Sequence, residues 1–217
     1  MQLAIFDLDN TLIAGDSDYL WGEFLCEQQL IDEKSYHSQN KRYYDDYRKG
    51  ELDIEDFLRF QLHFIAGKKH EDLEDLRKRF IDEKIRPILL RKAIDLIDDH
   101  RKKHHRLLVI TATNRFITEP ISRLYNIVDL IATEVEISNG VYTGRHQGTP
   151  SYAAGKIKRL EMWLLEQSDS PSESWFYSDS HNDIPLLNYV DHPVAVDPDE
   201  TLRQHARGNG WKIISLR

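Results

Sequence analysis

The sequence of 217 residues contains a single cysteine, Cys26. One thiol excludes an intrachain disulfide and a zinc site built from several thiolates, and it fits a reducing compartment. No apolar run approaches the roughly 20 residues needed to cross a bilayer. The first residues, MQLAIFD, also lack the basic start and long apolar stretch of a signal peptide. We therefore expect a soluble, cytoplasmic protein.

Positive charge is also in short supply. The chain has 29 lysines and arginines against 37 aspartates and glutamates, so its formal net charge is -8. Such a chain offers no electrostatic footprint for a nucleic-acid backbone or an anionic membrane, and we expect neither as a partner. Hydrophobic residues make up 40% and charged residues 30% of the chain, which permits a packed core beneath a solvated surface. The sequence carries no signal of an oligomeric state.

Short apolar runs alternate with stretches of helical spacing along most of the chain. The runs that end in polar loops lie at residues 3–6, 107–110 and 174–178, and shorter strand patterns lie at 193–196 and 211–214. The helical stretches lie at residues 88–104, 116–125 and 152–166, with another beginning near 199. This alternation predicts an α/β fold, a Rossmann-like parallel sheet with helices on both faces, whose polar loops meet at the carboxyl edge.

One segment breaks the alternation. Residues 16–85 have helical spacing and many charges but no strand pattern. We interpret them as an inserted all-helical cap domain, so that residues 1–15 and 86–217 form the catalytic core domain. Asp16 and Asp53 are expected N-caps of cap helices. Asn139-Gly140 between two apolar stretches predicts a hairpin that forms a small flap.

The strongest local motif is Asp7-Leu8-Asp9-Asn10-Thr11, which follows the first apolar run. Two carboxylates one residue apart at a strand end can reach the same small volume. One could attack an electrophile while the other handles protons. Alone, the motif fits turn and capping residues equally well.

Two further acids follow a later strand, in Asp179-Ser180-His181-Asn182-Asp183. Four carboxylates in one crevice repel one another, so the cluster implies raised pKa values or a bound cation. Magnesium fits because it prefers oxygen ligands and joins carboxylates to phosphate oxygens. Phosphoryl transfer also needs cationic and hydroxyl partners for the phosphate.

Thr111 and Lys156 are the candidates for that phosphate-holding role. Thr111 ends a mid-chain strand, and Lys156 lies near the start of a helix, where backbone amides add positive potential. A lone helix lysine is more often part of a solvated face. A role for Lys156 in phosphate binding is therefore supported only by its occurrence together with the other motifs.

These motifs, in this order, resemble those of the haloacid dehalogenase superfamily. The resemblance covers roughly residues 1–15 and 86–217, and the insertion after the first motif is similar to that of the branch with phosphoserine phosphatase and some histidinol-phosphatases. It implies that Asp7 is the nucleophile and a magnesium ligand, and that Asp9 is the acid/base and a ligand through its carbonyl. It further implies that Asp179 binds Mg²⁺ with support from Asp183.

The resemblance also implies that Thr111 and Lys156 hold the phosphate, with Asn182 assisting nearby. The implied enzyme is a magnesium-dependent phosphatase that hydrolyses a small-molecule phosphomonoester through an aspartyl-phosphate intermediate. The acid at the Asp9 position weighs against dehalogenation. A phosphomutase-like phosphotransferase stays open, and a non-catalytic phosphoacceptor signalling domain fits the motif order less well.

The cap is expected to choose the leaving group. The chain departs from phosphoserine phosphatase at Ala112-Thr113-Asn114, where that enzyme has small glycines, and it has Asp16 where that enzyme carries a glutamate that reads the amine. Cap residues such as Trp21, Arg42 and Tyr43 could suit a ring-bearing substrate. These features favour histidinol phosphate or a similar amino-alcohol phosphate, with phosphoserine as the alternative. The role of His181 stays open between a substrate contact and a structural one.

Overall fold

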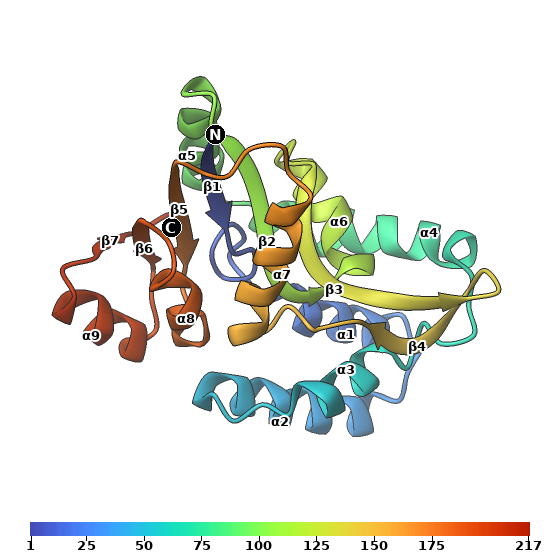
Figure 1. The fold of residues 1–217 in the computed structure, drawn as a ribbon. Helices are drawn as coiled ribbons and strands as arrows, with labels where there is room; N and C mark the ends of the chain where they lie inside the picture. Colours follow the sequence, from blue (N-terminus) through green and yellow to red (C-terminus); the bar gives the residue numbers. More distant parts are fainter.

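The computed structural model describes residues 1–217 and contains one seven-stranded sheet with the order β4-β3-β2-β1-β5-β6-β7. The strands are β1 (Gln2–Phe6), β2 (Arg106–Asn114), β3 (Asp129–Ser138), β4 (Val141–Gln147), β5 (Glu173–Ser178), β6 (His192–Val196) and β7 (Lys212–Ile214). All neighbouring pairs are parallel except β3 with β4. The predicted α/β class is therefore confirmed, with β1 at the centre of the sheet (Figure 1).

Helices cover both faces of this sheet because alternate residues of β1 point to opposite sides. Ala4 and Phe6 pack into a cluster that includes residues of α5 and α6, whereas Leu3 and Ile5 pack into a second cluster with residues of α7, α8 and α9. These helices are α5 (Arg91–Lys102), α6 (Arg115–Leu124), α7 (Ala154–Leu165), α8 (Ile184–Leu187) and α9 (Glu200–Gly208). The continuous apolar run of β1 thus reflects burial on both faces.

The segment between β1 and α5 is helical, as its pattern predicts. It contains α1 (Ser17–Glu27), α2 (Glu33–Lys49), α3 (Ile54–Leu62) and α4 (His70–Phe80), followed by the π-helical turn Ile81–Ile85 and the 3-10 turn Arg86–Ile88. The Asp16 side chain accepts a hydrogen bond from the Tyr19 amide and caps α1, and Asp53 caps α3 in the same way. In Figure 1, α2 and α3 lie across from the ends to which the strand arrows of the core point.

The hairpin is present, but it differs from the expected small flap. The first half of β3 pairs in parallel with β2, and only its second half forms the antiparallel hairpin with β4. Residues 129–133 are therefore a core strand that the sequence interpretation missed. The hairpin also contacts the cap: the Gly67 amide donates to the Tyr142 carbonyl at 2.8 Å, and the Tyr142 amide donates to the Lys68 carbonyl at 2.9 Å. The hairpin thus joins the core to the cap by backbone hydrogen bonds, in addition to the chain segments that link them.

Candidate active site

Asp7 follows β1 directly and lies at the centre of a buried charge cluster. Its Oδ1 accepts a hydrogen bond from Lys156 Nζ at 2.7 Å, and the same ammonium group donates to Asp183 Oδ2 at 2.7 Å. Ser178 Oγ donates to that Asp183 oxygen, also at 2.7 Å. Asp7 is 6% exposed and Lys156 and Asp183 are each 3% exposed. The first strand, the helix α7 and the loop after β5 therefore bring their charged residues to one point.

Asp9 lies in the loop beyond Asp7, where its carboxylate is a hydrogen-bond acceptor from two directions. The Ser17 amide at the start of α1 donates to its Oδ1 at 2.7 Å. Thr113 Oγ1 donates to its Oδ2 at 2.9 Å, and Thr111 Oγ1 lies 3.4 Å from the same oxygen. Asn10 has φ of 57°, a left-handed conformation that asparagine tolerates and that lets the chain turn back after Asp9.

Asp179 is connected to the first motif by Thr11. Thr11 Oγ1 donates to Asp179 Oδ1 at 3.1 Å and accepts from the Asp179 amide, also at 3.1 Å. Thr11 is fully buried, so this contact holds the loop after β5 against the loop after β1. The threonine of the first motif therefore has a positioning role.

Burial changes the ionisation of these groups. Burial raises the pKa of Asp7 to about 7; Lys156 lowers it only in part, and Asp183 raises it further. Burial raises the pKa of Asp9 to about 6, and the Asp16 carboxylate adds to that rise. Burial, with Asp7 and Asp183, also raises the pKa of Asp179 well above its ordinary value. For Lys156, burial alone would lower the pKa, but the two carboxylates raise it overall.

The donor set of this site fits a hard divalent cation. Asp7, Asp179 and Asp183 are three carboxylates, and Lys156 is the only cationic side chain that pairs with them. No three acidic, histidine or cysteine side chains converge on one metal position. Mg²⁺ does not require such a cluster, because it is usually held by one or two carboxylates together with waters and substrate oxygens. Asp7 and Asp179 are the side chains that could supply those carboxylates.

A cavity lined by 17 residues extends from these acids toward the cap helices. Its floor includes Asp7, Asp9 and Thr111. Its cap side is aromatic and apolar, with two buried amides: the residues there are Tyr19, Asn40, Tyr43, Tyr44, Tyr47, Leu52, Ile54, Phe57 and Gln61. No lysine, arginine or histidine lines the cavity, whereas Asp16 and Asp18 do. The cavity is therefore acidic at its base and aromatic at its wall.

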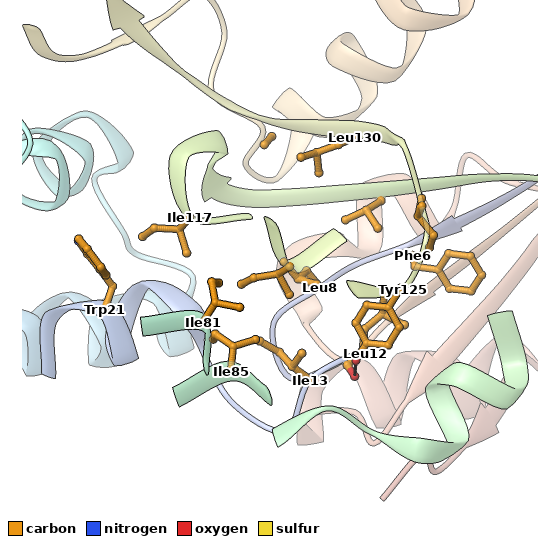
Figure 2. Packing of buried hydrophobic residues seen from close by; sticks show 14 of the residues in the cluster. Phe6, Leu8, Leu12, Ile13, Trp21, Ile81, Ile85, Ile117, Tyr125 and Leu130 are labelled. Carbon is orange, nitrogen blue, oxygen red and sulfur yellow. Dashed lines mark hydrogen bonds between the residues drawn. The ribbon is translucent and has the colours of Figure 1, made fainter. Parts of the chain in front are cut away.

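The four cap residues named from the sequence fall into two groups. Asp16 and Tyr43 line the cavity. Trp21 is 1% exposed in the hydrophobic core (Figure 2), lies edge-to-face with Phe80, and does not line the cavity. The Arg42 side chain is 57% exposed and pairs with Asp56 at 3.3 Å. The expectation that Trp21 and Arg42 face a substrate therefore disagrees with their positions, since one fills the core and the other lies on the surface.

Asn182 and His181 also lie away from the cavity lining. Asn182 Nδ2 donates to the Tyr47 carbonyl at the end of α2 at 3.0 Å, and its Oδ1 accepts from the Tyr152 hydroxyl at 3.3 Å. Both the amide and the ring Nδ1 of His181 contact Asp199 Oδ2, at 2.7 and 2.8 Å. In this conformation Asn182 joins the core to the cap, and His181 fixes its loop to the N-cap of α9.

Sequence reasoning missed several residues of the cavity. Thr113 donates to Asp9, but in the sequence it stands out only as a bulkier residue where phosphoserine phosphatase has glycine. Asp18 carried a weak signal as a second acid two residues after Asp16. Tyr47 and Tyr152 carried none, because an aromatic residue in a helix or loop is most often packing.

Comparison with known proteins shows which family has this arrangement. The sequence model of the haloacid dehalogenase-like hydrolases matches residues 4–188. The chain belongs to the haloacid dehalogenase-like hydrolase family. It is 42% identical over 220 residues to a histidinol-phosphatase of Neisseria meningitidis serogroup C, with 100% of this chain and 99% of the relative covered. Membership and the phosphatase relatives together show that the enzyme is a phosphatase.

Two solved structures share the fold. A protein of unknown function from Bordetella pertussis Tohama I superposes with a TM-score of 0.93 at 39% identity, covering 100% of this chain and 99% of that one. A phospho-aspartyl intermediate analogue of phosphoserine phosphatase superposes with a TM-score of 0.71 at 17% identity, covering 100% and 93%. The second likeness concerns the fold alone. No helix of the chain has the length and apolar character required of a membrane span.

Proposed function

We propose that this phosphatase is magnesium-dependent and hydrolyses the phosphomonoester of a small amino alcohol, with histidinol phosphate as the best substrate, through an aspartyl phosphate formed on Asp7. The observation that carries the proposal is the 2.7 Å contact of buried Lys156 with both Asp7 and Asp183. This ammonium favours the ionised form of Asp7 and could also balance charge on a transferred phosphoryl group.

In the proposed first step, Asp7 attacks phosphorus and Asp9 protonates the departing alcohol oxygen. A pKa of about 6 for Asp9 suits this role because a useful fraction of the group is protonated near neutral pH. In the second step, Asp9 takes a proton from water as the water attacks the phosphoaspartate, which restores Asp7 and releases phosphate. Thr111 would hold a phosphate oxygen, while the cap would exclude bulk water.

A bound Mg²⁺ would neutralise phosphate oxygens and the excess carboxylate charge of the site. We propose that Asp7 and Asp179 hold it, with the carbonyl of Asp9, and that Asp183 supports it indirectly. We also propose that residues 1–15 and 86–217 act as the catalytic core domain and residues 16–85 as the cap domain. We propose that Asn182 holds the cap through its hydrogen bond to the Tyr47 carbonyl and does not bind the phosphate.

The cavity supports an amino-alcohol phosphate more than phosphoserine. Phosphoserine carries a carboxylate next to its amine, and a buried carboxylate needs a cationic partner. No lysine, arginine or histidine lines the cavity. Histidinol phosphate has an amine and an aromatic ring but no carboxylate, and its ring could contact the tyrosines of the cap. The histidinol-phosphatase relative favours a phosphatase over a phosphomutase or a signalling domain.

The proposal is tested by kcat/KM for histidinol phosphate, phosphoserine and sugar phosphates, with Mg²⁺ and with EDTA. We expect histidinol phosphate to rank first and EDTA to abolish turnover. Asp7→Asn should abolish turnover of every substrate and Asp9→Asn should slow it by about 10²-fold to 10⁴-fold. Asp98→Asn, which removes an exposed carboxylate on α5, is the matched control. Turnover by Asp7→Asn would refute the assignment of Asp7 as the nucleophile. A higher kcat/KM for phosphoserine than for histidinol phosphate would refute the proposed substrate.

A further inference from the structure

Asp18 is a buried carboxylate in the cavity that the proposed chemistry does not use. It lies in the first turn of α1, is 3% exposed, and lines the cavity beside Asp16. Burial raises its pKa well above the ordinary value, and Asp16 and Asp9 add to the rise. A carboxylate in such a position is unfavourable unless another group compensates its charge.

The neighbouring Asn114 fixes how Asp18 is presented. Asn114 ends β2, and its Oδ1 accepts from the Ile117 amide at 3.3 Å as the N-cap of α6. Its Nδ2 must therefore face the other way, where it donates to Asp18 Oδ1 at 3.1 Å. Asn114 is 2% exposed, so this amide cannot rotate freely. It holds Asp18 as a hydrogen-bond acceptor.

The protein supplies no cation for Asp18. Asp7 and Asp183 share the ammonium of Lys156, but no lysine, arginine or histidine lines the cavity where Asp18 lies. Asp16 differs from Asp18 because its carboxylate caps the N-terminus of α1 and accepts from the Tyr19 amide at 2.9 Å. The helix end thus compensates Asp16. Asp18 lies in the first turn of the same helix and accepts from Asn114, but the cavity offers it no cationic side chain.

Asp18 also lies close to the reacting end of the cavity. Thr113 donates to Asp9, the proposed acid, and the next residue, Asn114, donates to Asp18. In an amino-alcohol phosphate with the amine on the second carbon, the ammonium group lies only a few bonds from the ester oxygen that Asp9 would protonate. The aromatic side chains of the cap lie beyond, where they could cover a positive charge or a ring.

We infer that Asp18, held by Asn114, is a specificity-determining residue that binds the ammonium group of the substrate. This inference rests on the proposed function for the identity of the alcohol, and it adds the residue that distinguishes an amine-bearing phosphomonoester from a neutral one. Asn114 is the positioning residue, acting through Asp18. The segment Ala112-Thr113-Asn114 departs from the glycines of phosphoserine phosphatase. In this chain Thr113 contacts the proposed acid Asp9, and Asn114 contacts the proposed amine-binding Asp18.

The test compares two substrates that differ only in the amine, histidinol phosphate and its deamino analogue, an imidazolylpropyl phosphate. A hydrogen-bonded buried charge pair corresponds to a preference of about 10-fold to 100-fold in kcat/KM for the amine. Asp18→Asn keeps the shape and the acceptor for Asn114 but removes the charge, so we expect the preference to fall to about one. Asn114→Ser keeps an N-cap for α6 but loses the Nδ2 group that reaches Asp18, and we expect a smaller fall of about 3-fold to 10-fold, mostly in KM.

Asp98→Asn on the outer surface of α5 is the charge-matched control and should keep the wild-type preference. Asp16→Asn is a comparator, because asparagine caps a helix as well as aspartate; it should reduce the preference less than Asp18→Asn. Circular dichroism and thermal unfolding check that each variant folds. Asp18→Glu, which keeps the charge, replaces Asp18→Asn if the latter does not fold, and should retain part of the preference by holding the carboxylate in a shifted position.

Failure of the inference is separable from failure of the proposed function. If the wild type prefers histidinol phosphate over its deamino analogue and Asp18→Asn keeps that preference, the inference is wrong and the proposed substrate stands. If histidinol phosphate is a poor substrate, the proposed substrate is wrong, and aminoethyl phosphate against the equally large propyl phosphate tests Asp18 in its place. Absence of any amine preference in the wild type for either pair overturns the inference.

Discussion

Replacing Lys156 with methionine removes the ammonium group between two buried carboxylates while keeping most of the side-chain volume. The group lies 2.7 Å from Asp7 and 2.7 Å from Asp183. One ion pair at about 4 Å and an effective dielectric of about 20 is worth about 4 kcal/mol. Removal of one partner of a buried pair commonly costs about 3–5 kcal/mol. We expect the free energy of unfolding to fall by that amount at pH 8 in EDTA.

The loss should depend on pH in a definite direction. The pKa of Asp7 is already raised by burial and lowered in part by Lys156, so the variant should raise it further. A carboxyl group with a raised pKa binds its proton more tightly in the folded than in the unfolded state. Its destabilising effect is therefore full above the folded pKa and disappears as the pH falls toward the unfolded value. The loss of stability in the variant should therefore be smaller at pH 5 than at pH 8.

Urea unfolding of the wild type and of Lys156→Met at pH 5 and pH 8 measures both effects. Lys158→Met changes an exposed lysine of the same helix and controls for the added methionine. Mg²⁺ should recover part of the loss at pH 8, because a ligand that binds only the folded state stabilises it. A loss below about 1 kcal/mol at pH 8, or an equal loss at both pH values, would refute the view that Lys156 balances buried charge.

Three further results are expected. His100 has its pKa lowered to about 4 by burial, with His105 adding to the effect, so its neutral form costs no stability above about pH 6.5, and the free energy of unfolding falls by at most about 3 kcal/mol as the pH drops toward 4; urea unfolding of His100→Gln should show a correspondingly shallower loss in acid. Gly144 has φ of 80° and a methyl group there would lie 2.7 Å from Ala66 Cβ, so Gly144→Ala should lower thermal stability by about 1–3 kcal/mol. Asn182→Ala removes the hydrogen bond to Tyr47 and should raise KM about fivefold with a small effect on kcat, as one lost bond is worth about 1 kcal/mol.

Each of these has an opposing outcome. Equal acid sensitivity of His100→Gln and the wild type would show that this histidine is not the titrating group. An unchanged unfolding temperature for Gly144→Ala would mean that the hairpin does not restrain the cap. An unchanged KM for Asn182→Ala would show that its contact with the cap does not contribute to substrate binding, and a loss confined to kcat would place Asn182 at the phosphate.

Much of the fold follows from local patterns. Every residue of the run at positions 3–6 is apolar, as expected of a strand that is covered by helices on both faces. In the structure this strand, β1, occupies the centre of the sheet. Asp16 and Asp53 were identifiable as caps because their side chains satisfy amides within the next three residues. The first half of β3 was missed because its apolar stretch at residues 130–132 is only three residues long and runs directly into the hairpin pattern.

Some residues of the candidate site were likewise predictable from the sequence, and others were not. Asp7 and Asp9 are separated by one residue in the chain, and the polar loops after β2 and β5 must meet them because parallel strands share a carboxyl edge. The sequence alone therefore indicated the acids, Thr111 and the family. It did not indicate that Trp21 fills the core while Asp18 lines the cavity, although both lie on α1.

The sequence by itself thus determined the α/β class, the inserted helices and the chemistry that a row of strand-end acids can perform. Only the tertiary structure decided which charges lie within contact distance, that Lys156 joins Asp7 to Asp183 and that Asn114 holds Asp18. The physical reason is the distance along the chain over which each interaction acts. Propensity and capping act over a few residues, whereas the electrostatics of a buried site depend on groups brought together from distant strands and on how completely water is excluded from them.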